Sequence, residues 1–169
     1  HKVAEETDIV ELDNEAKDVP IVHKKLNDFL KQFKLHIQFS EEEVAHFMLP
    51  RDNVIESYVV QDPTTNEITD TLVSTLFHPV FSDIQITKPY MLLINSITSQ
   101  ANTQLLTVKE RLELGQIKEL DVFNALDIHN NSEFFEELKF GVGDGNLHYY
   151  FYNWRVNKLQ PGQCGITLV

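Results

Sequence analysis

Two strand-like runs joined by one polar turn constrain the fold of this chain most strongly. The runs are residues 53–60 (NVIESYVV) and 68–77 (ITDTLVSTLF), and the connection between them reads QDPTTNE. Both runs are rich in β-branched residues, and a short connection of Asp, Pro and Asn between such runs is typical of a β-hairpin. This pattern commits the middle of the chain to a sheet, against which the remaining elements must pack.

The segment 16–33 (AKDVPIVHKKLNDFLKQF) is predicted to form an amphipathic helix. Asp18 can cap its N-terminus, and Pro20 falls in the first turn, where a missing N–H costs nothing. Six apolar side chains recur at helical spacing and define the face expected to enter the core: Val19, Val22, Leu26, Phe29, Leu30 and Phe33.

A shorter helix is predicted over FSEEEVAHFMLP, which begins at Phe39. Ser40 and Glu43 have the spacing of a capping box, and Phe39 with Val44 has the spacing of a hydrophobic staple around it. Pro50 is expected to end the helix, because the residue before a proline avoids helical backbone angles.

Further elements are expected on both sides of the hairpin. Strands are predicted at 7–12, 88–97, 120–126, 146–154 and 164–169, and helices at 103–119 and 130–138. Helices and strands therefore mix around one sheet, which indicates an α/β or α+β fold in a single domain.

Composition and charge narrow the range of functions. The chain has 26 acidic and 14 basic residues, a net charge of −12, which argues against a nucleic-acid binder. No apolar run is long enough to span a membrane. The seven histidines include no HExxH motif and have no cysteine partners, so no metal site is expected. The single Cys164 is interpreted as a small core residue and fits a reducing compartment, the cytoplasm.

A glycine-rich loop near the C-terminus is the first candidate site. In FGVGDGNLHYYFYNW, Gly141, Gly143 and Gly145 fall within five residues, and Asp144 stands between two of them. A phosphate-binding loop would have a different spacing and would open a helix, whereas an aromatic, strand-like run follows here. A carboxylate among open backbone amides suits a cation or a peptide backbone. A tight turn with a solvated Asp144 is the alternative.

Two further residues are candidates, each with two interpretations. Asn124 interrupts the apolar run 120–126, and a buried amide needs partners, so it is either a satisfied core amide or a ligand contact. The last residues alternate like a strand up to Val169. That strand either ends at the surface or carries the terminal carboxylate into the fold, where the charge must be paired or used.

Four stretches of the chain resemble the C-terminal half of the glycylpeptide N-tetradecanoyltransferases, or N-myristoyltransferases. They are FSEEEVAHFMLPRDNVIESYVV, DVFNALD, FFEELKFGVGDGNLHYYFYNW and the terminal GITLV. The likeness covers essentially the whole chain and is weakest between Thr71 and Glu119.

The resemblance implies a GNAT-type, acetyltransferase-like mixed sheet flanked by helices, one half of a pseudo-symmetric two-domain fold. Residues 1–169 are then the peptide-binding half, and the acyl-CoA-binding half is not in this chain. The whole enzyme moves myristate from myristoyl-CoA to the N-terminal glycine amine of a protein substrate. This half binds no cofactor, and its partners are the glycine peptide and the other half. The isolated chain is expected to be inactive.

The resemblance also assigns roles to the candidates. Gly143, Asp144 and Gly145 would form part of the peptide-binding wall, Asn124 would line the same groove, and the Val169 carboxylate would be the general base. An α-amino group has a pKa of about 8 and an α-carboxylate one of about 3.5, so proton transfer between them costs about 6 kcal/mol in water. Burial narrows this gap, because it raises the carboxylate pKa and lowers the amine pKa.

Two other functions are compatible with the sequence. The altered segment 71–119 allows a non-catalytic peptide-binding module of the same fold. A free-standing acetyltransferase-like enzyme is the third possibility, but no glycine-rich loop that could cradle CoA is visible.

Overall fold

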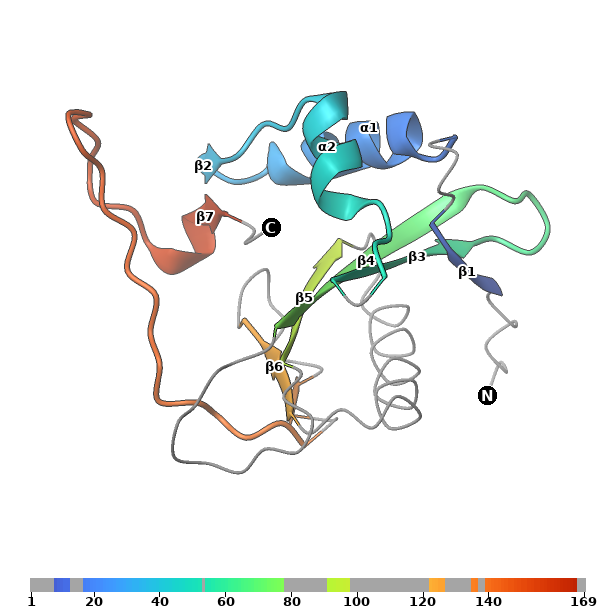
Figure 1. The fold of residues 1–169 in the computed structure, drawn as a ribbon. Coiled ribbons are helices and arrows are strands. Elements are labelled where there is room, and N and C mark those ends of the chain that lie inside the picture. The colour runs from blue at the N-terminus through green and yellow to red at the C-terminus, as the bar shows by residue number, and fades with distance from the viewer. Residues whose placement is uncertain are drawn as a thin grey trace, which may run out of the picture.

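The fold combines a mixed five-stranded sheet with a layer of two helices (Figure 1). The computed structural model describes residues 8–12, 17–52, 54–77, 91–97, 122–126, 135–136 and 139–166. The elements, in chain order, are β1 (Asp8–Glu11), α1 (Val19–Leu30), β2 (Leu35–His36), α2 (Glu41–Met48), β3 (Ile55–Gln61), β4 (Ile68–Phe77), β5 (Met91–Ile97), β6 (Val122–Ala125), the 3₁₀-helix η1 (Pro161–Gln163) and β7 (Cys164–Gly165).

The predicted hairpin is present as β3 and β4, which pair antiparallel. Its turn is stabilised by Asp62, whose Oδ1 accepts hydrogen bonds from the backbone N–H groups of Thr64 (2.8 Å) and Thr65 (2.9 Å). These two hydrogen bonds lower the pKa of the Asp62 carboxyl, and the bond from Thr65 has the larger effect. Asn66 completes the turn in a left-handed conformation with φ of 57°, which asparagine tolerates well.

The strand order in the large sheet is β1-β3-β4-β5-β6. The first three pairs are antiparallel, whereas β5 and β6 are parallel. The predicted strands at 7–12, 88–97 and 120–126 therefore exist as β1, β5 and β6, with shorter bounds. A parallel pair needs a long crossover connection, which agrees with the mixed α/β character inferred from the sequence.

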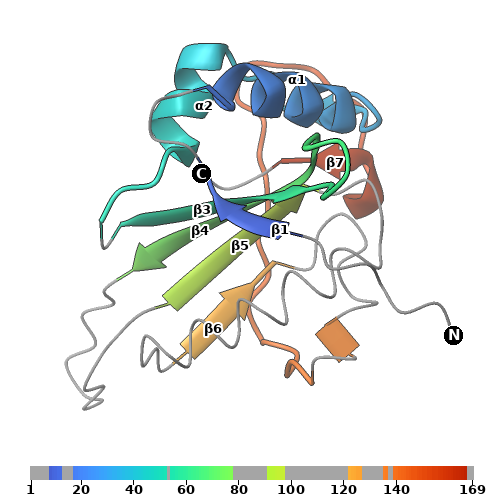
Figure 2. The same ribbon diagram turned by 90° about the vertical axis from the view of Figure 1, so that its right-hand side faces the viewer.

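Helices α1 and α2 cover one face of this sheet (Figure 2). Helix α1 contacts β4, and helix α2 contacts β3. The core between the layers contains Leu12, Val19, Val22, Leu26, Leu30, Phe39, Val44, Met48, Ile55, Val59, Ile68 and Val73, with Phe29 and Phe33 packed against it. The apolar face predicted for the first helix is thus the buried face.

The starts of the two helices differ from each other. The predicted capping box is present, because the Glu43 N–H donates to Ser40 Oγ (3.2 Å) and the Ser40 N–H donates to Glu43 Oε2 (2.7 Å). The bond from the Ser40 N–H lowers the Glu43 pKa. The predicted cap by Asp18 is wrong, since its side chain makes no capping bond. Asp18 has helical backbone angles, and Pro20 has no N–H to donate to a cap.

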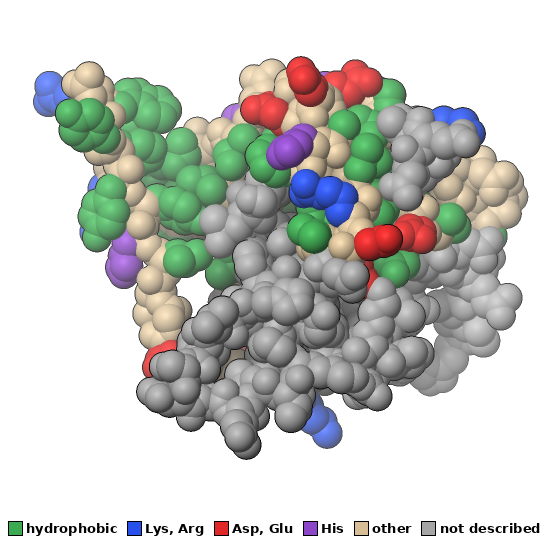
Figure 3. Space-filling model, viewed as in Figure 1, with side chains coloured by type: hydrophobic (Ala, Val, Ile, Leu, Met, Phe, Trp, Pro, Cys, Tyr) green, Lys and Arg blue, Asp and Glu red, His purple; other side chains and the backbone are tan. Residues whose placement is uncertain are grey.

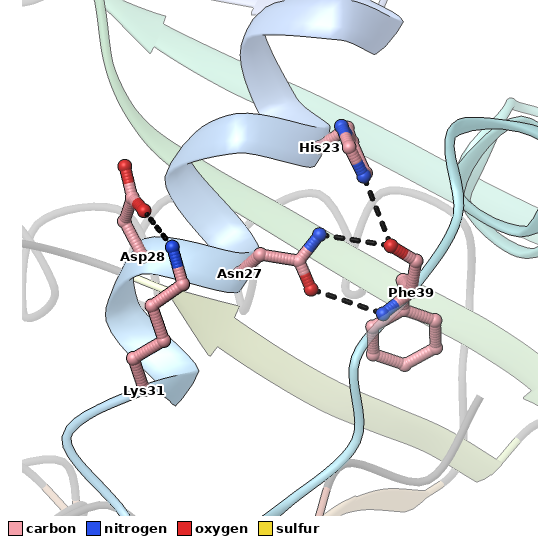
Figure 4. A network of polar contacts seen from close by, with 5 residues as sticks. All are labelled: His23, Asn27, Asp28, Lys31 and Phe39. Atoms are coloured by element: carbon pink, nitrogen blue, oxygen red, sulfur yellow. Dashed lines mark hydrogen bonds and ion pairs between the residues drawn. The ribbon is translucent and has the colours of Figure 1, made fainter.

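A polar clamp joins α1 to the segment before α2 (Figure 4). The Asn27 amide donates to the Phe39 carbonyl oxygen (2.9 Å) and accepts from the Phe39 N–H (3.0 Å). The His23 Nε2 lies 2.9 Å from the same carbonyl oxygen. Asn27 is buried at 9% exposure, so these bonds satisfy an amide that would otherwise be costly inside the core.

One predicted strand is wrong. Residues 146–154 form no strand in the structure, and they lie within an extended segment, 141–159, that we call the C-terminal arm. Figure 1 shows this arm leaving the body of the protein, turning back, and rejoining it at η1. Aromatic residues favour strands only where a neighbouring strand is available to pair and pack, and among the described residues none pairs with the arm.

Other predictions are tested only in part. The expected helix at 103–119 lies outside the described residues, and of 130–138 only Phe135 and Glu136 are described, both helical. The last predicted strand is present as the short β7, whose partner β2 was not predicted. Among the described ranges, no helix combines the length and the hydropathy that crossing a membrane requires.

Candidate functional site

A hollow of about 630 Å³ lies between the C-terminal arm and the body of the protein. Its lining comes from four separate parts of the chain, represented by Leu35 of β2, Leu126 directly after β6, Gly145 in the arm, and Cys164 of β7. The other lining residues are Asn146, Leu147, His148, Tyr149, Tyr150, Phe151, Val156, Asn157, Lys158, Leu159, Pro161 and Ile166. The volume falls within the range of about 300–1,000 Å³ that is usual for ligand pockets.

The walls of this hollow present polar and apolar surface in similar amounts. The arm supplies polar side chains to this lining, namely those of Asn146, His148, Asn157 and Lys158 and the hydroxyl groups of Tyr149 and Tyr150. Such a lining suits an extended chain that presents both apolar groups and backbone amides. Among the described residues, no group of three or more His, Cys, Asp or Glu side chains lies together in a way that could bind a metal ion.

The predicted glycine loop forms the start of the arm, and its residues are exposed. No described glycine has a positive φ. A Cβ atom added at Gly141, Gly143 or Gly145 would meet no atom within 4 Å. Among the described residues, neither of the two usual reasons for a glycine, a left-handed backbone or a close neighbour, applies to these three.

Asp144 is the one carboxylate of the arm, which also carries Arg155 and Lys158. It is exposed, and it makes no hydrogen bond or ion pair with another residue in the part of the chain that the structure describes. The neighbouring Gly145 lines the hollow. Asp144 is therefore the sequence neighbour of a residue that lines the hollow, and no described residue neutralises its charge.

The structure places Asn124 in β6, where it pairs with Leu93 of β5. Leu126, two residues after Asn124, lines the hollow. Val169 lies outside the described residues, and Ile166, three positions before it, is part of the lining. Three of the segments singled out in the sequence, namely the end of β6, the glycine loop and the C-terminal tail, therefore meet at one hollow.

Comparison with known proteins identifies the family. Residues 1–165 match the family described as "Myristoyl-CoA:protein N-myristoyltransferase, C-terminal domain". The chain belongs to this family.

Curated relatives agree with the N-myristoyltransferase assignment. The chain is 40% identical to glycylpeptide N-tetradecanoyltransferase 1 of Arabidopsis thaliana over 162 residues, which cover 92% of this chain and 36% of that protein. It is 39% identical to a probable glycylpeptide N-tetradecanoyltransferase of Caenorhabditis elegans, over 99% of this chain and 38% of that protein. The chain thus spans little more than a third of the length of these two relatives.

Several solved structures with the same fold are described as acetyltransferases. An acetyltransferase of Trypanosoma brucei superposes with a TM-score of 0.65 at 12% identity, over 86% of this chain and 100% of that one. A predicted acetyltransferase of Clostridium acetobutylicum, solved with acetyl-CoA, gives a TM-score of 0.66 at 14% identity, over 86% of this chain and 96% of that one. At this identity the similarity establishes the fold alone, and it confirms the acetyltransferase-like class predicted from the sequence.

The chain also carries an exposed apolar surface along the arm, which includes the run 146–154 that the sequence predicted as a strand. Val142, Tyr150 and Tyr152 are 101%, 88% and 97% exposed, and Trp154 is 62% exposed. Figure 3 shows hydrophobic side chains following the projecting arm. The aromatic run 146–154 was the sequence signal for this surface. However, β-propensity does not distinguish a strand inside a sheet from an exposed, unpaired segment.

Proposed function

We propose that this chain is the peptide-binding and base-supplying domain of an N-myristoyltransferase. The complete enzyme would transfer myristate from myristoyl-CoA to the N-terminal glycine amine of a protein. The observation that carries this proposal is the convergence of the β6 end, the glycine loop and the C-terminal tail on one hollow. These are the segments to which the family resemblance assigns peptide binding and catalysis.

The glycine loop is proposed as part of the peptide wall. Gly143 and Gly145 leave open space beside their backbones, which would let a peptide backbone approach closely. Asp144 between them would face a basic side chain of the substrate, and Asn124 would line the same groove. The exposure of Asp144 supports this role, because its charge is available to a ligand.

The terminal carboxylate of Val169 is proposed as the general base. The ammonium form of the substrate's N-terminal glycine would give a proton to this carboxylate, and the resulting neutral amine would attack the thioester carbonyl of myristoyl-CoA. A C–N bond forms, the C–S bond breaks, and CoA leaves as the thiol or thiolate. Only the main-chain carboxylate of Val169 takes part, so the side chain at this position should matter little.

Acyl-CoA would be bound by an upstream domain rather than by this chain. The exposed aromatic side chains of the arm support the presence of such a neighbour, because a large apolar surface on a monomer usually marks an interaction site. This chain is proposed to contribute no cofactor site of its own. Cys164 is a free thiol, which supports a reducing location such as the cytoplasm.

An activity assay on a joined enzyme tests this proposal. The part of the Arabidopsis relative that precedes its matching segment is fused to His1 of this chain, and the fusion is called the joined enzyme below. Adding residues after Val169 should lower kcat by about 10²–10⁴-fold, because it replaces the carboxylate with a neutral amide. Val169→Leu should leave kcat within a few-fold. In the extended enzyme, peptide affinity should change much less than kcat.

Three results would contradict parts of the proposal. An extended joined enzyme with full kcat would exclude the terminal carboxylate as the base. Clear binding of myristoyl-CoA to the 169-residue chain alone would show that the acyl-CoA site is misplaced. A joined enzyme that binds glycine peptides but never transfers myristate would favour the non-catalytic peptide-binding module.

A further inference from the structure

The C-terminal tail is attached to the helical layer through a short parallel ladder. Strand β7 pairs with β2, and the register places Cys164 opposite Leu35 and Gly165 opposite His36. The two strands are far apart in the sequence, yet Figure 1 shows them next to each other, beside the helices. The position of the tail is therefore set by the segment that follows α1.

Gly165 differs from the other described glycines, because a neighbouring side chain fills the space beside it. A Cβ atom at this position would lie 2.3 Å from Cδ2, 2.6 Å from Cγ and 3.0 Å from Cβ of Phe33. Gly165 is also buried. The contact with the Phe33 ring thus requires glycine, and any larger residue must displace the ring or the tail.

Both partners in this contact are themselves fixed. The Phe33 ring packs edge-to-face on Phe29, with centroids 5.7 Å apart, and the Phe33 carbonyl oxygen lies 2.8 Å from Nδ1 of His36. On the tail side, the Gln160 N–H donates to Gln163 Oε1 (3.1 Å) in the turn that leads into β7. The ring and the tail therefore meet between two locally ordered segments.

We propose that Phe33 and Gly165 are positioning residues that set the register of the C-terminal tail and thereby the place of the Val169 carboxylate. This inference rests on the proposed function of that carboxylate. Val169 lies four positions after Gly165. A slip of one residue in the β2–β7 pairing moves an extended tail by about 3.3 Å, which is enough to take a base out of hydrogen-bond reach.

The attachment can be measured in the chain alone, because Cys164 is its only cysteine and is the residue of β7 that pairs with Leu35 of β2. The rate of reaction with the thiol reagent DTNB reports how often the tail leaves β2. Gly165→Ala should raise this rate at least about tenfold, since it opposes docking against Phe33. Phe33→Leu in the same chain should reverse most of the increase by making room for the new methyl group. Gly162→Ala is the matched control, because a Cβ at Gly162 meets nothing within 4 Å, and it should leave the rate unchanged.

The catalytic consequence is measured in the joined enzyme. Gly165→Ala should lower kcat by at least about tenfold while the peptide KM changes by less than about threefold, which is the pattern for a misplaced base. Phe33→Leu combined with Gly165→Ala should restore kcat, and Gly162→Ala should leave it unchanged. If Gly165→Ala prevents folding, Phe33→Leu alone replaces it, and it should raise the DTNB rate and lower kcat to a smaller extent.

The outcomes separate the attachment from the function. An unchanged DTNB rate in Gly165→Ala would overturn the attachment, whatever the activity. A raised DTNB rate with full kcat would overturn the positioning role and leave the attachment. If a C-terminal extension leaves kcat intact, the terminal carboxylate is not the base, and the positioning role is excluded as well. The DTNB rate still tests independently whether the tail is attached through Phe33.

Discussion

The helical layer with its hairpin and the C-terminal arm use the same kinds of side chain in opposite ways. In residues 17–77, side chains such as Val22, Leu30 and Val59 are at most 1% exposed. In the arm, 141–159, seven large hydrophobic side chains are between 41% and 101% exposed: Val142, Leu147, Tyr149, Tyr150, Phe151, Tyr152 and Trp154. Composition alone therefore does not decide burial.

The difference lies in what the chain offers as a partner. The helices bury their apolar faces against β3 and β4, which the same stretch of sequence supplies. The arm has no helix or strand of its own, and no backbone–backbone hydrogen bond joins residues 141–159 to the described structure. Residues 17–77 thus supply most of the partners for their own apolar side chains. The arm would instead complete a surface with the proposed upstream domain and the peptide.

The largest expected effect contrasts Leu30 in the core with Tyr152 in the arm. Leu30→Ala should lower the unfolding free energy of the isolated chain by about 2–5 kcal/mol, because it leaves a cavity in a fully buried site. Tyr152→Ala should change it by less than about 0.5 kcal/mol. Urea titrations of both variants measure the contrast. Similar losses in the two variants would mean that the arm is packed against this chain after all.

A smaller loss is expected when the clamp between the helices is cut. Asn27→Ala removes both hydrogen bonds to Phe39 and leaves a buried N–H unpaired, so stability should fall by about 1–3 kcal/mol. His23→Ala should cost less, because the Phe39 carbonyl keeps its bond from Asn27. Denaturant unfolding of both single variants and the double variant measures the effects. An Asn27→Ala chain as stable as the parent would remove the clamp from the list of stabilising contacts.

A change in the arm should affect ligand binding rather than stability. Asp144→Asn in the joined enzyme should weaken a peptide with a basic residue facing this position by about three- to tenfold, as expected for a partly exposed charge pair. A peptide with a neutral residue there should lose almost nothing, and the melting temperature should stay the same. Affinities from calorimetry with the two peptides provide the test, and an equal loss for both would exclude a charge-reading role.

The smallest predicted effect is a pH dependence at the start of α2. The Ser40 N–H lowers the Glu43 pKa below its ordinary value of 4.5, so this carboxylate stabilises the fold above that pH. The contribution is lost as the pH falls through the lowered pKa of the folded state. Glu43→Gln should therefore be less stable than the parent at pH 7, and the two should converge in acid. A stability difference that stays constant down to pH about 2 would contradict this assignment.

Local sequence signals predicted the two helices and the hairpin well. The capping box of α2, the apolar face of α1 and the turn at Asp62 each rest on residues within a few positions of one another. The clamp by Asn27 was not predicted, because nothing in the sequence shows which backbone group a buried amide will meet. The Asp18 cap failed because Pro20 removes one of the N–H groups that the cap needs.

The candidate site was predicted less completely, since it depends on contacts between distant segments. The glycine loop and the apolar tail were visible in the sequence, and the structure brings Gly145 and Cys164 to one hollow. The strand β2 has only two residues and no hydrophobic pattern of its own, so its pairing with β7 could not be foreseen. The arm was predicted as a strand because its residues favour strands wherever a partner exists.

Hydrogen exchange in the arm tests most directly whether it is built for a partner. Amides of residues 141–159 should exchange close to the unstructured rate in the isolated chain, while the amides of α1 and β3 are protected. In the joined enzyme, the arm amides should become protected, and a peptide with an N-terminal glycine should slow exchange further around Asp144. Strong protection of the arm in the isolated chain, or no change in the joined enzyme with peptide bound, would contradict its role as the binding surface of an N-myristoyltransferase.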